Sequence, residues 1–506
     1  MKRSALRTIL VALLAAAVLA PLAADQAGRG GGQIAAHKVL ANGLEVFAVE
    51  NHAVPLATIC VAFRGGASAQ TKEDAGLFHL YEHMLFDGNE KYPTQAAFMA
   101  ELNRMGVPSW NGSTGDQYIN YYITVPSDKL EEGIEFWSWA VKKPVFNEAK
   151  LEREKQVVIN EIRGYHNDPD QIAENAIVSR MFPAAPWRKN VDGPEANVQN
   201  ATIAQLEAIR AAYYIPKNTA LLIGGDVKPA AVFAMADKWF GDWKGGAAPT
   251  IGSPPQGAIP PDIKLVYPDQ DYYKGVAQVR FDWRGPDVLR QTKDTYTSDV
   301  FLFLLSSPVG RFKQDLVAKG PGLYDPEYIG FNYPTSRDGG TYDFDALLAL
   351  ADPSKDGSTL DRVEKLRGLL MDEFALIAKD PEAYFGAGEL EKAKTKLIDQ
   401  NLLSREVASS FVTDALTFWW SVATTDYFFG YENNCRTVSY ADIADLIRRY
   451  ILGSGPDQRP SSATEVRLQS DAYAAEPTSV DRAKTLGYSV VTADDAFWWQ
   501  RQGGGK

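Results

Sequence analysis

The chain has 506 residues, a formal net charge of −12 at pH 7, and 45% hydrophobic and 23% charged residues. This length exceeds what one hydrophobic core usually organises and predicts two or more domains. The acidic balance argues against a nucleic-acid partner and, without a basic amphipathic face, against binding to an anionic membrane.

Residues 1–24 are predicted to be a secretory signal peptide. Three basic residues within positions 2–7 precede an apolar run over residues 9–20, and small residues follow. The run is too short and wrongly flanked for a transmembrane span, and cleavage is expected after Ala20 or Ala24. We therefore expect a periplasmic protein, whose net charge becomes −15 because cleavage removes three positive charges.

Alternating apolar residues predict strands over residues 44–49 and 57–63 of the first half. Only two cysteines occur, Cys60 in the second of these strands and Cys435 in a polar segment of the other half. Export would allow a disulfide, but cysteines so placed predict none.

Residues 78–86 place three metal-competent side chains within an otherwise apolar run. A helix with 3.6 residues per turn stacks His79 on His83 and brings Glu82 close to the same face. Burying such groups is costly unless they are paired or bind a metal. The order HxxEH inverts the HExxH zinc helix, which predicts two zinc ligands and a carboxylate that acts on water. The alternative is two ordinary histidines beside a glutamate.

Residues 151–163 form a second predicted helix, which carries Glu154 and Glu161. Glu154 and Glu161 lie seven residues apart and are expected to face inward, where one of them can complete the three protein ligands that zinc hydrolases usually have. The predicted apolar stripe consists of Leu151, Val157, Val158 and Ile162. The charges predicted to lie on a solvated face are Glu152, Arg153, Lys155 and Arg163.

The remaining three histidines and two aromatic runs are predicted to have structural and not chemical roles. His37, His52 and His166 stand alone in polar segments and are predicted to lie at the surface. The runs at residues 418–420 and 497–499, each Phe-Trp-Trp, are predicted to be core or interface.

Residues 245–261 are rich in Gly and Pro and predict a linker between residues 25–244 and residues 262–506. The second part also opens with two strand-like segments, residues 263–266 and 276–281. The two parts therefore have the organisation of a duplication.

An offset of 221 residues aligns Thr71-Lys72-Glu73 with Thr292-Lys293-Asp294. The same offset aligns His79, Glu82 and His83 with Val300, Phe303 and Leu304, in that order. All five histidines precede residue 167. The second copy therefore cannot rebuild the metal site.

An HxxEH motif followed 78 positions after His83 by Glu161 resembles the pitrilysin and insulysin family, and most closely its two-domain bacterial branch related to mitochondrial processing peptidase. Further matching segments are residues 42–44, 65–68, 214–218 and 221–226. This resemblance implies an α+β fold of two homologous repeats, each a mostly antiparallel sheet with helices packed on it.

The resemblance also implies the chemistry. It assigns His79, His83 and Glu161 as ligands of one Zn²⁺, Glu82 as the general base and Glu154 as a second carboxylate near the metal. The implied activity is that of a zinc endopeptidase that cleaves peptides or unfolded polypeptide segments. A non-catalytic peptide-binding or structural subunit of the same fold is the alternative.

In the resembled family two repeats close as a clamshell on a peptide, which adds as a strand to a sheet edge. The corresponding edge strand here contains Asn111. The family's non-zinc half also supplies an Arg-x6-Tyr pair, of which this chain has Tyr324 but carries Val317 at the Arg position.

The missing Arg leaves two explanations. Either a nearby cation, Lys319 or Arg311, replaces it, or a paralogous partner subunit supplies the pair in a heterodimer. We favour the heterodimer over both the substitution and a homodimer.

Overall fold

The computed structural model describes residues 35–252, 263–333, 335–352, 357–453, 462–475 and 477–501. The predicted signal peptide and the predicted linker from residue 253 onward lie outside these ranges. Among the described residues, no helix is both long and apolar enough to cross a membrane.

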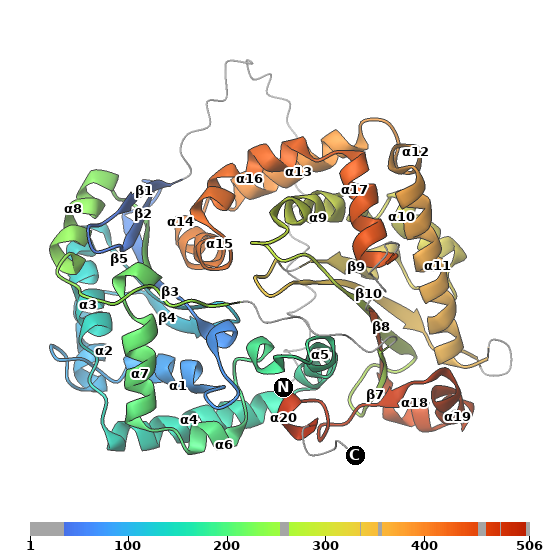
Figure 1. Ribbon diagram of the computed structural model, residues 1–506, viewed down its shortest axis with the longest axis horizontal. Coiled ribbons are helices and arrows are strands. Elements are labelled where there is room, and N and C mark those ends of the chain that lie inside the picture. Colours follow the sequence, from blue (N-terminus) through green and yellow to red (C-terminus); the bar gives the residue numbers. More distant parts are fainter. Residues whose placement is uncertain are drawn as a thin grey trace. The chain divides into compact units, whose positions relative to one another are not determined.

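The first repeat is built on a six-stranded sheet with the order β1-β2-β6-β3-β5-β4 (Figure 1). Neighbouring strands are antiparallel except β2 and β6, which are parallel. The central strand β3 is buried along most of its length, because both of its faces are covered. The strands are β1 (Ala36–Val39), β2 (Glu45–Glu50), β3 (Leu56–Arg64), β4 (Ser109–Thr114), β5 (Tyr118–Pro126) and β6 (Thr219–Gly225).

Helices of the first repeat begin where side chains cap them. Asn147 starts α4 by accepting a hydrogen bond from the Lys150 amide, and Thr202 forms a capping box with Gln205 at α7. The helices are α1 (Leu77–Leu85), α2 (Gln95–Arg104), α3 (Leu130–Lys142), α4 (Glu148–His166), α5 (Pro169–Met181), α6 (Glu195–Gln199), α7 (Ile203–Tyr213) and α8 (Pro229–Phe240).

The second repeat has a sheet with the order β12-β7-β11-β8-β10-β9, which reproduces the first sheet strand for strand from β2 to β4. The prediction of an α+β fold with two homologous repeats is therefore confirmed. In the second copy of the motif, Val300 and Leu304 are buried in the core. The strands are β7 (Ile263–Asp269), β8 (Val276–Arg284), β9 (Ile329–Asn332), β10 (Thr341–Ala349), β11 (Ser462–Gln469) and β12 (Ser489–Val490).

Helices also cover the second sheet (Figure 1). The helices of the second half of the chain are α9 (Thr292–Leu305), α10 (Arg311–Lys319), α11 (Thr359–Lys379), α12 (Pro381–Phe385), α13 (Glu389–Leu403), α14 (Ala408–Ser410), α15 (Thr417–Val422), α16 (Thr425–Thr437), α17 (Tyr440–Leu446), α18 (Ser470–Ala475), α19 (Pro477–Leu486) and α20 (Trp498–Arg501). Of these, α14 and α15 pack on strands of the first sheet, and α20 packs on α5.

Each sheet has its own hydrophobic core, and a third apolar cluster joins the repeats. In that cluster α5, from the first half of the chain, packs on β7 and β11 of the second sheet through residues such as Ile172 and Ile177. Ion pairs of Arg280 with Glu174 and of Arg467 with Asp170 flank the apolar contact. Helix α5 follows α4 directly in the chain, so the packing of α5 on the second sheet also holds the C-terminal end of α4 in place.

The two aromatic runs lie in the core or between repeats, as predicted. Trp420 is buried, its ring lies 3.9 Å from the guanidinium of Arg64, and its indole donates to Glu45. Phe497 and Trp499 pack on His166, at ring distances of 4.4 and 5.1 Å. His166 was predicted to lie at the surface, but this packing leaves it half-buried.

The two other isolated histidines lie in different surroundings. His37 also departs from the prediction, because it stacks on Phe47 at 4.3 Å, whereas His52 is exposed. Both cysteines are free thiols and are buried.

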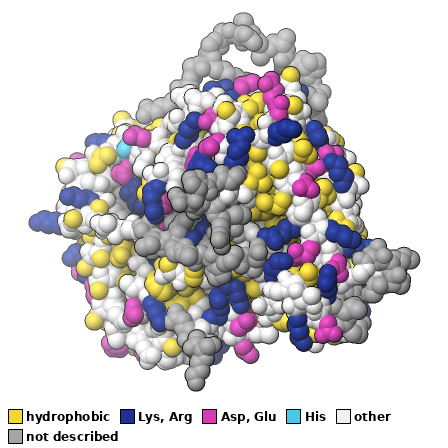
Figure 2. Space-filling model, turned by 45° about the vertical axis from the view of Figure 1, so that its right-hand side comes forward, with side chains coloured by type: hydrophobic (Ala, Val, Ile, Leu, Met, Phe, Trp, Pro, Cys, Tyr) yellow, Lys and Arg dark blue, Asp and Glu magenta, His cyan; other side chains and the backbone are white. Residues whose placement is uncertain are grey.

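On the molecular face in Figure 2, acidic and basic side chains are interspersed, so the net negative charge does not gather there into one patch.

Glu45 links the repeats and gives a stability prediction. Burial opposes its charged form, but hydrogen bonds from His37 and Trp420 and the charge of Arg64 outweigh burial and lower the pKa of Glu45 to about 2. A lowered pKa stabilises the fold above pH 4.5, and this stabilisation is lost as the pH falls toward 2. Glu45→Gln should therefore reduce the unfolding free energy at pH 7 by roughly 3 kcal/mol.

Urea unfolding of Glu45→Gln, wild type and the exposed control Glu73→Gln between pH 7 and pH 3 measures this effect. The deficit of the Glu45 variant should narrow below pH 4.5. A deficit that stays constant with pH would show that shape, and not charge, makes Glu45 stabilising.

Candidate metal centre

Helix α1 carries the motif and is held in the core of the first repeat. Seven of its nine residues are buried. It starts at Gly76, which has φ +93° and where a Cβ atom would lie 2.3 Å from the carbonyl oxygen of Asp192. Only glycine meets both conditions, so the start of α1 fits closely against the loop that contains Asp192.

Helix α4 runs beside α1 and differs from the predicted pattern at three positions. Val157 is 40% exposed, whereas Ile159 is buried in the stripe with Leu151. Lys155 was predicted to be solvated, but its side chain is buried and its amine bonds Glu152 at 2.6 Å. A lysine can bury its aliphatic stem while its charged end reaches a partner.

The structure brings His79 and His83 of α1 together with Glu161 of α4. Oε2 of Glu161 lies 3.7 Å from Nε2 of His79 and 3.3 Å from Nε2 of His83. One ligand atom from each residue lies within 4.8 Å of the other two. Among the described residues, this is the one group of His, Cys, Asp and Glu that meets this geometric condition.

The outer nitrogen of each imidazole faces a carboxylate. Nδ1 of His83 lies 3.5 Å from Oε2 of Glu154, and Nδ1 of His79 lies 3.7 Å from Oδ1 of Asp192. Protons on the Nδ1 atoms would leave both Nε2 lone pairs directed at the shared space, as in many metal sites. Glu154 thus lies behind His83, on the side away from Glu161.

Glu154 is itself held in place by charge. Arg153 donates to Glu154 at 3.1 Å and also pairs with the buried Asp87. Burial disfavours the charged form of Glu154, but the interactions with His83 and Arg153 outweigh burial and lower its pKa. The carboxylate therefore remains ionised beside His83.

Asp192 was missed by the sequence analysis. It lies in the loop before α6, 31 positions after Glu161, and no periodic pattern connects it to the motif. Burial raises its pKa to about 6, with a smaller contribution from Glu161. Only the fold of this loop against Gly76 reveals that it faces His79.

Glu82 lies at the inner edge of the site, next to β4. Thr114 of β4 donates a hydrogen bond of 2.7 Å to Oε2 of Glu82. A Cβ atom at Gly112 would lie 2.9 Å from Oε1 of Glu82, so a side chain there would crowd this carboxylate. Burial raises the pKa of Glu82, although the Thr114 hydrogen bond opposes the shift.

The site holds at least one neutral imidazole. Burial, followed by the effect of His83, lowers the pKa of His79 to about 4. A neutral imidazole offers the lone pair that a divalent metal needs. Two imidazole nitrogens and a carboxylate oxygen form a donor set typical of Zn²⁺, so the residues present fit this ion.

Strand β4 is the outermost strand of the first sheet, as predicted, and among the described strands it pairs only with β5. Asn111 is exposed on it. Trp110 is 38% exposed and its ring lies 5.4 Å from Phe86, at the end of α1. An open strand edge with an aromatic surface therefore adjoins Glu82.

Tyr324 lies after α10 in the second repeat, with an exposed side chain. Val317 packs at the margin of that repeat's core. Lys319 is engaged by Asp315 and Glu373, both at 2.9 Å. Arg311 bonds Asp315 and stacks on the ring of Tyr384 at 4.3 Å. Both cations considered as replacements for the missing Arg are therefore already paired within the second repeat.

Protein-family models match both repeats of this chain. Residues 45–195 match the model of the insulinase family, peptidase family M16, and residues 200–397 match the peptidase M16 inactive domain. The chain belongs to peptidase family M16, which contains the pitrilysin and insulysin enzymes that it resembles.

Individual relatives share only part of their length with this chain. An insulin-degrading enzyme homolog of Dictyostelium discoideum is 30% identical over 169 residues, which cover 33% of this chain and 17% of that protein. The mitochondrial-processing peptidase subunit beta of Blastocladiella emersonii is 26% identical over 202 residues, covering 40% of this chain and 43% of that protein. The matched segments thus span less than half of either relative.

The fold as a whole has solved counterparts. A protease from Helicobacter pylori superposes with a TM-score of 0.68 at 19% identity, covering 86% of this chain and 99% of that one. At this identity the likeness concerns the fold alone.

Proposed function

We propose that this chain is a zinc endopeptidase that cleaves peptides or unfolded polypeptide segments. The observation that carries the proposal is the convergence of His79, His83 and Glu161 beside the buried carboxylate of Glu82. A purely structural protein has no physical need for this group of ionisable side chains.

In this proposal both Nε2 atoms and the Glu161 carboxylate hold the ion. When bound, zinc supplies a Lewis acid that lowers the pKa of water toward ~7 and polarises a carbonyl. Glu154 lies 3.5 Å from Nδ1 of His83 and Asp192 lies 3.7 Å from Nδ1 of His79, so both carboxylates are placed to orient the imidazoles when the ion is bound.

Glu82 performs the proton transfers. Thr114 occupies Oε2, so Oε1 is the oxygen that accepts a proton from the attacking water. The same oxygen then donates the proton to the leaving amine. The raised pKa of Glu82 favours this return step, because a stronger base holds the proton until the amine takes it.

The substrate is proposed to lie along β4 as an added strand. The free edge of β4 offers main-chain donors and acceptors, and Asn111 is exposed on the same strand. Because Gly112 and Thr114 contact Glu82, a peptide along this edge passes the proposed base.

We further propose secretion to the periplasm and pairing with a paralogous subunit. The first proposal rests on the leader-like residues 1–24. The second rests on Val317 at the Arg position and on the paired state of Lys319 and Arg311. The alternative function is a non-catalytic peptide-binding subunit, and the model matched by the second repeat is described as an inactive domain.

Zinc affinity distinguishes the proposed ligand from the residues behind the imidazoles. Glu161→Gln should weaken zinc binding most, because it removes a direct charge from the ion. Glu154→Gln and Asp192→Asn should each lose about 10–100-fold, which is typical of residues that orient a ligand. Titration against a competing chelator ranks the three variants. A larger loss in the Glu154 variant than in the Glu161 variant would reverse the proposed roles.

A further inference from the structure

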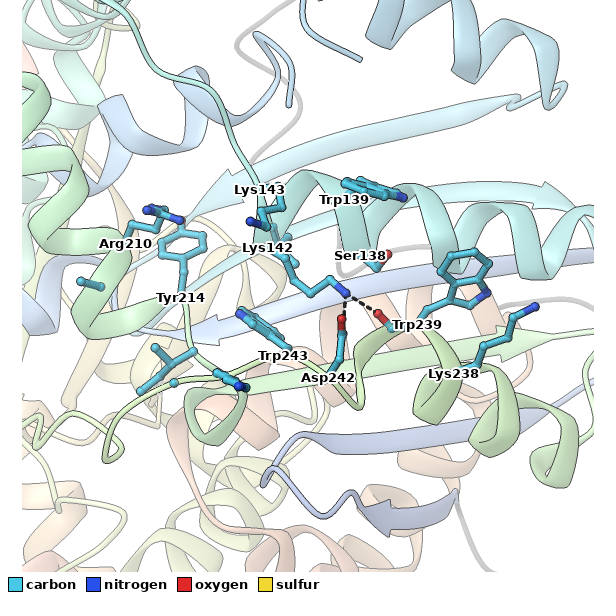
Figure 3. Close-up of a pocket in the computed structure, with 15 residues that line it drawn as sticks. Ser138, Trp139, Lys142, Lys143, Arg210, Tyr214, Lys238, Trp239, Asp242 and Trp243 are labelled. Atoms are coloured by element: carbon cyan, nitrogen blue, oxygen red, sulfur yellow. Dashed lines mark hydrogen bonds and ion pairs between the residues drawn. The ribbon is translucent and has the colours of Figure 1, made fainter. Parts of the chain in front are cut away.

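A second site is formed by a pocket of about 620 Å³ in the first repeat (Figure 3). It lies where α3, α7 and α8 end, and the segment after α8 closes it. Its volume is within the range of small-molecule sites. Trp139, Trp239, Trp243 and Tyr214 give it aromatic walls.

Positive charge dominates this pocket in a chain that is acidic overall. The charged side chains that line it are Lys142, Lys143, Arg210, Lys238, Lys244 and Asp242. The lining thus contains five cations and one carboxylate, and two of the cations, Lys143 and Lys238, pair with Glu90 and Glu131, which lie outside the lining.

Some of these cations form hydrogen bonds at helix ends, but others do not. Lys142 donates to the Trp239 carbonyl at 2.7 Å and to Asp242 at 2.8 Å, so it ties the ends of α3 and α8 together (Figure 3). Lys244 lies outside any helix and has no ion-pair partner in the described part of the chain. Within the described ranges Arg210 bonds Glu207 through Nε only, and its two terminal nitrogens make no other hydrogen bond there.

The inner wall of the pocket leads to α1. Tyr214 lies in that wall, and its ring contacts the ring of Tyr81 at 4.1 Å. The hydroxyl of Tyr214 bonds that of Tyr121, whereas the buried hydroxyl of Tyr81 has no hydrogen-bond partner among the described residues. A buried polar atom without a partner requires an explanation.

We propose that this pocket binds a small organic anion with an aromatic body, such as an arylalkyl carboxylate. The indole and phenol walls stack on the aromatic part, and Arg210 and Lys244 bind the carboxylate. The site is separate from the metal centre, because none of its lining residues is a proposed ligand or Glu82. Binding there does not depend on peptidase activity.

Calorimetric titration of the full chain with N-acetyltryptophan and with the neutral N-acetyltryptophanamide tests this proposal. The acid should bind once per chain and at least about tenfold more tightly than the amide. Arg210→Gln combined with Lys244→Gln should remove that preference, whereas Lys392→Gln on exposed α13 should keep it. Ala211→Trp, which fills the pocket and leaves its charges in place, should abolish binding of the acid.

The same titration in the presence of EDTA separates this site from the metal centre, since a carboxylate can also bind zinc. The proposal requires that EDTA leave the affinity unchanged. It would be overturned by loss of binding in EDTA, by equal affinity for acid and amide, by full binding to Ala211→Trp, or by an affinity for the acid weaker than about 1 mM.

Discussion

Glu82→Gln is expected to keep about one zinc per chain while peptide cleavage falls about 10²–10⁴-fold, the usual contribution of a general acid–base residue. Glu82 accepts a hydrogen bond from Thr114 of β4 and is not a member of the ligand group formed by His79, His83 and Glu161. The amide of Gln keeps the shape and can still accept from Thr114. It cannot take a proton, so only the chemical step is lost.

His83→Ala is the matched variant for metal binding. It removes one of two imidazoles and should lose both zinc and activity. Elemental analysis and hydrolysis of a fluorogenic unfolded peptide, measured on both purified variants, give the answer. A metal-free Glu82→Gln protein, or one that remains active, would contradict the proposed division of roles.

The second large effect concerns the partner subunit. The pure chain is expected to bind zinc and cleave poorly, because loss of one donor to a developing oxyanion costs about 10²–10³ in rate. A paralogous subunit that carries an Arg-x6-Tyr pair should restore this lost part of the cleavage rate. A stable complex of this kind should bury well over ~1,000 Å².

Light scattering and peptide hydrolysis by the chain, with and without the paralogue, measure this effect. Val317→Arg provides an internal test, since it returns a cation at the Arg position, seven residues before Tyr324, and should recover part of the rate without a partner. Val317 lies at the margin of the core, so the longer side chain has a path to solvent. Full turnover by a monomer or homodimer would refute the heterodimer and leave the zinc site unaffected.

The sequence by itself determined the features that local periodicity controls. The 3.6-residue repeat places His79 above His83 on one helix, and alternation predicts the paired strands that begin both repeats. The loss of the motif in the second repeat is also visible in the sequence, because Val300 and Leu304 replace the histidines. The resemblance added Glu161, which no periodicity within α1 could supply.

Only the tertiary structure decided which distant segments complete the site. Asp192 behind His79, Thr114 and Gly112 beside Glu82, and the position of Glu154 at Nδ1 of His83 depend on how loops and a strand edge pack around α1. The burial of Lys155 and the packing of His166 against the C-terminal aromatic run also escaped prediction. The physical reason is that such contacts join residues far apart in the chain, whose approach is set by the packing of whole elements and not by the local pattern of side chains.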